Sequence, residues 1–227
     1  MSESDIDLGI RTYVLRSGRM TEAQRRAIEE SGPRFILPFD PLRRLDVAEL
    51  FGDARPLVAE IGFGMGQATW RIAQENPTTG YLGIEVHRPG VGKLLLDIER
   101  EGIQNIRIIN HDAVEVFERM IPPASLAGLH IFYPDPWPKK RHQKRRLIRE
   151  GLVSLLASRL APGAYIYFVT DIENYAECSL ELLTRTAGLR NRYAGFAPRQ
   201  AWRPETKFEL RARHDGREAW ELLFERT

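Results

Sequence analysis

Four acidic side chains stand directly after apolar stretches of this sequence, at points where a strand is predicted to end. They are Glu85, Asp112, Asp135 and Asp171. Ligands of open parallel sheets bind outside the carboxyl ends of the strands, so this series predicts a site for a molecule rich in hydrogen-bond donors. Glu85 can accept from both hydroxyls of an adenosine ribose, and Asp112 from the exocyclic amine of an adenine. Alternatively, Asp112 or Asp171 taken singly is equally typical of a helix N-cap.

The stretch L-V-A-E-I-G-F-G-M-G-Q, from Leu57 to Gln67, predicts a strand, a glycine-rich turn and the start of a helix. Gly62, Gly64 and Gly66 suit the turn because a side chain there would clash or hold the backbone away from a ligand. The alternative is a turn that binds nothing.

The spacing of the three glycines favours one cofactor over another. Dinucleotide enzymes prefer G-x-G-x-x-G, whereas this turn reads G-x-G-x-G with Glu60 two residues before it. A pyrophosphate at this turn would be repelled by that carboxylate, whereas S-adenosylmethionine has no phosphate and carries an ammonium and a sulfonium. We therefore expect S-adenosylmethionine as the cofactor.

The run F-Y-P-D-P-W-P-K-K-R-H-Q-K-R-R, Phe132 to Arg146, begins in the last two residues of the fourth predicted strand and continues into the loop after it. Its prolines stiffen the loop and fix the directions of Asp135 and Trp137. A carboxylate beside an indole suits an aromatic base, which the ring can stack on while the acid accepts from N–H groups. Alternatively, Trp137 only anchors the loop in the core.

Basic charge is concentrated in one segment. The net charge is only +2, yet Lys139–Arg146 holds six Lys or Arg and no acid. Such a cluster beside a catalytic loop predicts polyanion binding, and the alternative is a solvated helix start. Further arginines at 11, 16, 19, 25, 26 and 34 either contact phosphates or form a solvated arm.

The tail contains R-P-E-T-K-F-E, from Arg203 to Glu209. A carboxylate such as Glu209 can accept from N1–H and the 2-amino group of guanine. On residue types alone, a charged hairpin is the preferred explanation of the stretch.

The elements that must position these residues alternate along the chain. Repeated strand–helix units predict a doubly wound, mostly parallel α/β sheet, in which a last strand without a crossover helix is antiparallel. A helical stretch is expected at 21–30, and 194–215 reads as irregular. The predicted strands are 57–61, 81–86, 106–109, 129–133, 164–169, 189–193 and 219–224, and the main helices 67–73, 89–100, 113–120, 145–160 and 173–187.

Length and composition predict one domain over 41–227, preceded by an Arg-rich extension over 1–40 that lacks a clear core pattern and is expected to be loose without a partner. The one cysteine, Cys178, excludes a disulfide or multi-cysteine metal site within the chain, and we expect no metal. No run is apolar enough for a signal core or a membrane span, which predicts a cytoplasmic protein.

Several motifs together resemble the bacterial single-subunit tRNA (guanine-N7)-methyltransferases over nearly the whole chain. They are R-T-Y-V-L-R-S-G-R-M-T, A-E-I-G-F-G-M-G, G-I-E-V-H, D-P-W-P-K-K-R-H-x-K-R-R, T-D-x-x-x-Y and T-K-F-E. The resemblance implies the Rossmann-like fold of class I S-adenosylmethionine-dependent methyltransferases and methyl transfer to a guanosine in the variable loop of tRNA. Ile172 departs from the family, where an aromatic residue is expected.

Roles carried over by the resemblance extend those derived above. It implies that Glu60, Glu85, Asp112 and Asp135 line the methyl-donor site together with the glycine turn. It implies that substrate is contacted by Lys139, Asp171, Thr206, Lys207, Phe208 and Glu209, and RNA by Arg141, His142, Gln143, Lys144, Arg145 and Arg146. No obligatory protein partner is implied.

Guanine N7 carries a free lone pair and no proton, so its methylation needs positioning more than a strong base. A carboxylate such as Asp135 can stabilise the positive charge that the purine gains. Two rival functions stay open. A small-molecule methyltransferase would share the glycine turn but has no use for the basic run, whereas a non-catalytic RNA-binding protein would leave the turn and the carboxylates unexplained.

Overall fold

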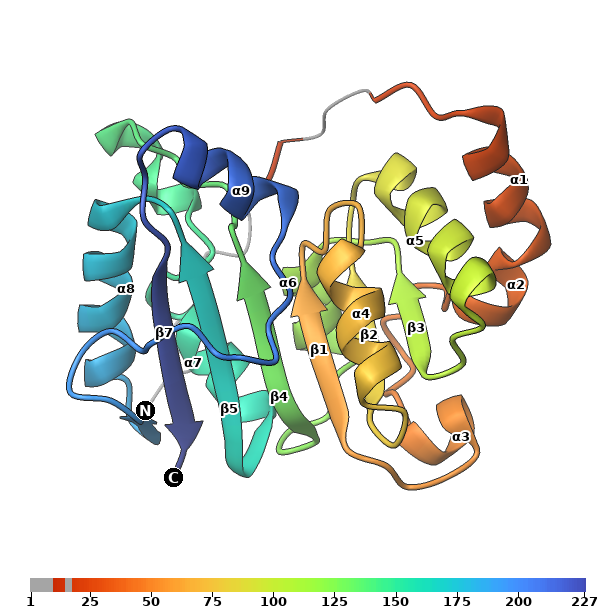
Figure 1. The fold of residues 1–227 in the computed structure, drawn as a ribbon. Coiled ribbons are helices and arrows are strands. Elements are labelled where there is room, and N and C mark those ends of the chain that lie inside the picture. Colours follow the sequence, from red (N-terminus) through yellow and green to blue (C-terminus); the bar gives the residue numbers. More distant parts are fainter. Residues whose placement is uncertain (1–9, 15–17) are drawn as a thin grey trace.

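The computed structural model describes residues 10–14 and 18–227, and leaves out the side chains of Lys207, Phe208 and Ala212. Figure 1 shows a twisted sheet with helices on both faces. The strands are β1 (Leu57–Ile61), β2 (Gly80–Ile84), β3 (Ile106–Ile109), β4 (Leu126–Phe132), β5 (Leu160–Thr170), β6 (Leu189–Asn191) and β7 (Trp220–Arg226). The helices are α1 (Glu22–Glu30), α2 (Gly32–Phe35), α3 (Val47–Phe51), α4 (Gln67–Glu75), α5 (Arg88–Glu101), α6 (Ala113–Arg119), the 3-10 helix η1 (Lys140–Arg145), α7 (Leu152–Arg159), α8 (Glu173–Arg185) and α9 (Lys207–His214).

The seven strands lie in the order β3-β2-β1-β4-β5-β7-β6, so the predicted seven-stranded sheet is confirmed. The strands from β3 to β5 pair in parallel, and β7 runs antiparallel to both β5 and β6, as predicted for a strand with no crossover helix. The parallel strands therefore end together at one edge, the top in Figure 1. Three strands start earlier than predicted: β2 by one residue at Gly80, β4 by three at Leu126 and β5 by four at Leu160.

Both faces of the sheet are covered, and every residue of β1 is buried. On one face the apolar side chains of α6, α7 and α8 pack against the sheet. On the other face α4 and α5 do so, joined by Ala27 of α1 and Phe35 of α2. Strands enclosed in this way read as continuous apolar runs, which is why they were recognisable in the sequence. No helix in the described part of the chain is long and apolar enough to cross a membrane.

The predicted helix near the N-terminus is present as α1. Thr21 accepts a hydrogen bond from the backbone N–H of Gln24, whose side chain in turn accepts from the N–H of Thr21. This reciprocal cap fixes the start of the helix. The Gln24 side chain also donates to the carbonyl of Pro89 (3.1 Å), and α1 lies along α5 in Figure 1. A domain boundary near residue 40 stays a prediction, although α1 and α2 share the core of the sheet.

The helix predicted over 145–160 is wrong in its first half. Arg146 has an extended backbone, and Gly151 has φ 75°, so the α-helix begins only at Leu152. Leu147 and Ile148 are buried as the apolar pattern required, but in a loop. The N–H of Ile148 donates to the Tyr175 hydroxyl (3.1 Å) instead of to a helical carbonyl. Periodicity therefore identified the buried residues without showing that a left-handed glycine interrupts them.

The tail predicted as irregular over 194–215 contains α9 at its end, so that prediction is wrong for this part. Thr206 caps the helix by accepting from the N–H of Glu209 (3.2 Å). Thr followed three residues later by Glu is a helix-start pattern that was present in the sequence. Trp202 anchors the preceding loop by stacking on His130 of β4, with ring centroids 5.2 Å apart.

Candidate active site

The glycine turn between β1 and α4 has the backbone shape that its sequence requires. Gly62, Gly64 and Gly66 have φ of 73°, 59° and 75°, in the left-handed region that favours glycine. The Gly62 N–H donates to the carbonyl of Ile84 in β2 (2.8 Å), which fixes the turn to the neighbouring strand. A side chain on Gly66 would place its Cβ 2.7 Å from Leu94, so α5 packs tightly against the turn.

A second close approach holds this turn against α5. A Cβ on Gly90 would lie 1.9 Å from the carbonyl oxygen of Gly64. No side chain fits in that space, so Gly90 is required for the turn and the start of α5 to meet. The sequence analysis did not single out Gly90, because it lies in a predicted helix instead of a turn.

Glu85, at the end of β2, ties the turn to the next loop. Its two carboxylate oxygens accept from the N–H groups of Gly64 and His87, each at 2.8 Å. Burial raises the pKa of Glu85, while these backbone donors act in the opposite direction. Each oxygen keeps a second lone pair, so Glu85 can still accept a hydroxyl from a ligand.

A cavity of about 420 Å³ opens beside the turn at the carboxyl ends of the strands. Four of the residues predicted to bind the methyl donor line it: Gly62, Gly64, Glu85 and Asp135. Apolar walls come from Ile61, Ile84, Val86, Ala113 and Leu147. A concave, mostly apolar cavity with a few polar groups is typical of a small-molecule site, and this volume falls within the usual range.

The other predicted donor-site residues lie outside the cavity lining. Gly66 packs against Leu94, and Asp112 caps α6 by accepting from the N–H of Val114 (2.8 Å). Glu60 is buried beneath the turn, and its burial raises its pKa to about 7, an effect reduced by the Thr69 hydroxyl. These three residues are not among those that line the cavity in this structure.

The loop that carries Asp135 is held in an unusual backbone conformation. Tyr133 and Trp137 have φ of 51° and 43°, values that non-glycine residues seldom adopt. The Tyr133 N–H donates to the carbonyl of Val169 in β5 (2.8 Å), which fixes the loop to the sheet. Such strain persists only where the surroundings impose it, and it clusters at functional sites.

Residues near the N-terminus complete the cavity wall, a role that the sequence analysis missed. Thr12, Tyr13 and Val14 line the cavity together with residues of the glycine turn. They lack any core pattern, so only the motif R-T-Y-V could have pointed to them. The Trp137 indole N–H donates to the Thr12 carbonyl (3.0 Å). This side chain therefore holds the backbone of the N-terminal segment against the Asp135 loop.

Two of the residues implied to contact substrate, Asp171 and Glu209, are already paired with arginines in this structure. Asp171 forms an ion pair with Arg217. Glu209 is buried and accepts two hydrogen bonds from Arg203 (2.7 and 3.0 Å) and one from Arg199 (3.2 Å). Burial acts to raise the pKa of Glu209, but these two arginines lower it overall. Thr206 serves as the cap of α9, and the side chains of Lys207 and Phe208 lie outside the described part of the chain.

The basic run divides into exposed and buried members. Lys139, Arg141 and Lys144 are exposed, and His142 and Gln143 are half-buried. Arg146 is buried, donates to the carbonyl of Pro136 (3.0 Å) and to Asn174 (3.1 Å), and stacks on Tyr175. Arg146 is therefore a structural residue in this protein, whereas the exposed members can meet a polyanion. Arg16 of the N-terminal arginines lies outside the described residues.

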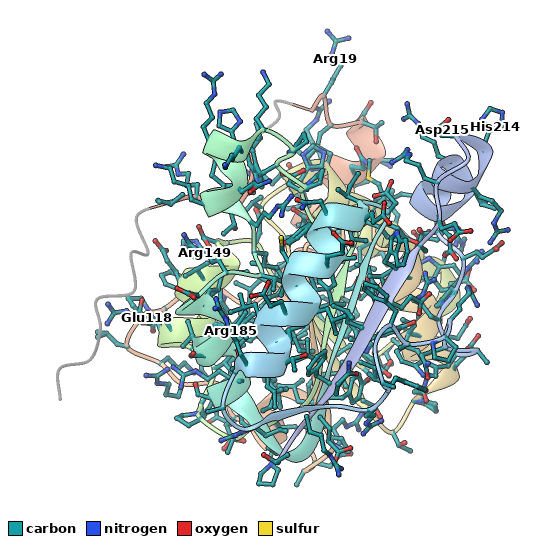
Figure 2. All side chains as sticks on the ribbon, turned by 90° about the vertical axis from the view of Figure 1, so that its left-hand side faces the viewer. Arg19, Glu118, Arg149, Arg185, His214 and Asp215 are labelled. Carbon is teal, nitrogen blue, oxygen red and sulfur yellow. The ribbon has the colours of Figure 1, made fainter. Side chains whose placement is uncertain are left out.

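The edge that bears the cavity also carries projecting charge. In Figure 2 Arg19 stands at the top of the molecule, and His214 and Asp215, at the end of α9, lie somewhat lower at the upper right. Arg149, Arg185 and Glu118 lie lower on that view. The upper edge therefore combines the cavity with arginine-bearing segments from both ends of the chain.

The sheet order, the glycine turn and the cavity beside it define a class I S-adenosylmethionine-dependent methyltransferase. Solved structures share this fold. The 16S rRNA methyltransferase KamB superposes with a TM-score of 0.60 at 15% identity, covering 81% of this chain and 95% of KamB. A 16S rRNA (adenine(1408)-N(1))-methyltransferase from Catenulisporales acidiphilia gives a TM-score of 0.56 at 14% identity, covering 83% and 92%.

Sequence comparisons identify the family more closely. A family model described as a putative methyltransferase matches residues 54–222. The chain is 54% identical over 215 residues to a tRNA (guanine-N(7)-)-methyltransferase of Burkholderia cenocepacia, covering 95% of this chain and 84% of that protein. It is 52% identical to the protein of that name from Thiobacillus denitrificans, covering 96% and 95%. The chain belongs to the tRNA (guanine-N(7)-)-methyltransferase family.

Proposed function

We propose that this protein transfers the methyl group of S-adenosylmethionine to N7 of a guanosine in tRNA, and that the target lies in the variable loop. The observation that carries the proposal is the joining of two features at one edge: a donor-sized cavity beside the glycine turn and an exposed basic segment directly after Asp135. A small-molecule methyltransferase has no use for the second feature, and a non-catalytic RNA-binding protein none for the first.

The donor site is formed by the cavity-lining residues in this proposal. Glu85 accepts hydroxyls of the ribose, and the glycine turn leaves its backbone open to the donor. Asp112 reaches the adenine amine from the start of α6, and Glu60 and Gly66 fix the turn from below. S-adenosylmethionine supplies an electrophilic methyl group bonded to a sulfonium.

Asp135 is the residue that we place beside the reacting purine. Guanine N7 presents a lone pair and no proton, so no base is needed at that atom. The purine gains positive charge during the transfer, and a carboxylate in the cavity stabilises that charge more in the transition state than in the ground state. The strained loop supports this role because it fixes the carboxylate before substrate arrives.

The substrate contacts form a second part of the proposal. Lys139, Arg141 and Lys144 contact tRNA phosphates, and Asp171 with residues 206–209 lies beside the target nucleoside. Glu209 reads the guanine edge only if its bonds to Arg203 rearrange or leave an oxygen lone pair free. We also propose that the protein acts in the cytoplasm without an obligatory protein partner.

One assay tests the function. The purified chain alone is incubated with methyl-labelled S-adenosylmethionine and bulk tRNA, and the digested nucleosides are analysed for 7-methylguanosine. We expect the label in 7-methylguanosine from the variable loop. Label in another nucleoside, or none without a second protein, would contradict the proposal.

A further inference from the structure

The stretch Arg11–Val14, called the strap below, lies beside segments of the chain that are distant from it in sequence. Thr12, Tyr13 and Val14 contribute to the cavity wall, together with β1, β2 and the Asp135 loop. The strap is not part of a helix or strand. Its position therefore depends on contacts made by other segments.

Side chains from the Asp135 loop and η1 hold the strap by its backbone. The Trp137 indole N–H donates to the carbonyl of Thr12 at 3.0 Å. Arg145 donates through Nε to the carbonyl of Arg11 at 3.1 Å and through Nη2 to that of Tyr13 at 3.2 Å. Three successive carbonyls are thus bound by two side chains, and the contacts do not depend on the side chains of the strap.

Arg145 and Trp137 also fix each other. The Arg145 guanidinium lies 3.9 Å from the centroid of the Trp137 ring, within the range of a cation–π contact. A planar guanidinium can stack on a ring and donate sideways at the same time, which a lysine ammonium cannot do. We call this pair the clamp.

The strap reaches across to the other wall of the cavity through Tyr13. Tyr13 lines the same cavity as His111 and Ala113 at the start of α6, and burial and the nearby Asp112 carboxylate raise the pKa of its hydroxyl. The strap therefore bridges the loop after β4 and the loop after β3. Between these two loops lies the space assigned above to the adenosine end of the donor.

We infer that Arg145 and Trp137 are positioning residues for the methyl donor, because they hold the strap as a wall of the donor pocket. Without the clamp, the strap would have to be ordered when the donor binds, and that loss of conformational freedom would weaken binding. The inference rests on the proposed donor site. It also gives Arg145 a role in holding the strap, which the exposed Arg141 does not share.

Calorimetric titration of the full-length protein with S-adenosylmethionine, in the absence of tRNA, tests the inference. Arg145→Ala is expected to weaken donor binding by about threefold to tenfold, the equivalent of one or two net hydrogen bonds. Trp137→Phe, which keeps the ring but removes the indole N–H, should weaken it by a smaller factor, and Arg145→Lys should fall between. Arg141→Ala is the matched control and should bind the donor as the unaltered protein does.

Hydrogen exchange supplies a readout that a general loss of stability would not reproduce. The donor should slow exchange in a peptide covering the strap in the unaltered protein and in Arg141→Ala, but much less in Arg145→Ala. If Arg145→Ala does not fold, Trp137→Phe and Arg145→Lys carry the same test.

A Glu85→Ala variant separates failure of this inference from failure of the donor site. If Glu85→Ala binds the donor more weakly while Arg145→Ala and Trp137→Phe bind it normally, the clamp is overturned and the donor site stands. If Glu85→Ala has normal affinity, the proposed donor site is wrong and the clamp falls with it.

Discussion

The carboxylates at the upper edge of the sheet differ in the ion pairs and hydrogen bonds that they already form. Asp135 lines the cavity, and within the described residues it makes no ion pair. Asp171 and Glu209 are paired with arginines, and Glu85 accepts from two backbone N–H groups. Residue type alone cannot make this distinction, because every one of them reads in the sequence as an acid near a strand end or in a charged tail.

Glu85 offers the most direct test of the donor site. Replacing it with Ala should weaken S-adenosylmethionine binding by roughly 1.5–3 kcal/mol, the range for a hydrogen bond to a charged group. Glu85→Gln, which keeps the shape but gives one oxygen in place of two, should lose less. Binding is measured by calorimetry, and thermal unfolding without ligand checks that the fold survives. Unchanged affinity in both variants would remove Glu85 from the site.

Glu60 should make stability depend on pH. Its pKa rises from an ordinary 4.5 to about 7 in the folded protein, chiefly because it is buried. The folded state therefore binds more protons than the unfolded state between these values, and stability is lost as pH rises through that window. The loss amounts to about 3 kcal/mol, from 1.36 kcal/mol per pKa unit.

Glu60→Gln removes that titration. We expect the difference in unfolding free energy between Glu60→Gln and the unaltered protein to shift in favour of the variant from pH 5 to pH 8. Urea unfolding at both values measures it. A pH-independent difference would mean that Glu60 stays ionised in the folded protein.

Secondary-structure elements were predictable where one physical signal dominated. Strands enclosed on both faces read as apolar runs, and the turn at Gly62, Gly64 and Gly66 followed from the type and spacing of these residues, which all have positive φ in the structure. Prediction failed where signals competed. The apolar spacing of 145–160 suggested one helix, although Gly151 breaks it, and the capping pattern of Thr206 and Glu209 was hidden among charges.

The site was predictable only as far as local sequence determines it. The turn and Glu85 belong to neighbouring elements, so topology brought them together. The strap could not be foreseen, because its place depends on Trp137 and Arg145, which are distant in sequence. The pairing of Glu209 with Arg203 likewise requires knowledge of side-chain directions.

Replacing Arg141 or Arg146 with Ala should affect the stability of the protein very differently. Arg146→Ala loses two hydrogen bonds and the stacking on Tyr175, so it should lower the free energy of unfolding by about 2 kcal/mol or more. Arg141→Ala should change that free energy by less than about 0.5 kcal/mol.

Arg141→Ala, which should leave stability nearly unchanged, should instead alter tRNA binding. Arg141→Ala should flatten a plot of log affinity against log salt by about one unit for the lost phosphate contact. An unchanged slope would show that the exposed arginine is only solvated. A normal unfolding free energy for Arg146→Ala would contradict its structural role.

For the molecule as a whole, selection of the base depends on how the upper edge receives the tRNA. Arg19 and the end of α9 both lie in the upper part of Figure 2, at some distance from each other, so segments from both ends of the chain reach this side. The phosphate contacts fix the orientation of the RNA, and contacts to base edges carry the choice of nucleoside. The contributions of tRNA shape and of base-edge contacts to this choice can be separated by changing one exocyclic group of the target base.

A tRNA with inosine at the target keeps N7 but lacks the 2-amino group. If a carboxylate reads that edge, methylation efficiency at subsaturating tRNA should fall by about 1–3 kcal/mol in transition-state terms. Adenosine, which has no N1 proton and carries an amine in place of the carbonyl, should be rejected more strongly. Equal rates for inosine and guanosine would assign selection to tRNA shape and the remaining base contacts.

The contact between Gly90 and the carbonyl of Gly64 limits how this architecture can be re-engineered. Because even a methyl group on Gly90 would collide with the turn, the turn cannot be moved alone into another scaffold. A graft of residues 57–67 would keep its shape only if the recipient also had a glycine near the start of the helix that follows its next strand, the position of Gly90 in α5. The functional module is thus a pair of segments separated in the chain, and a chimera that exchanges one without the other should assemble poorly.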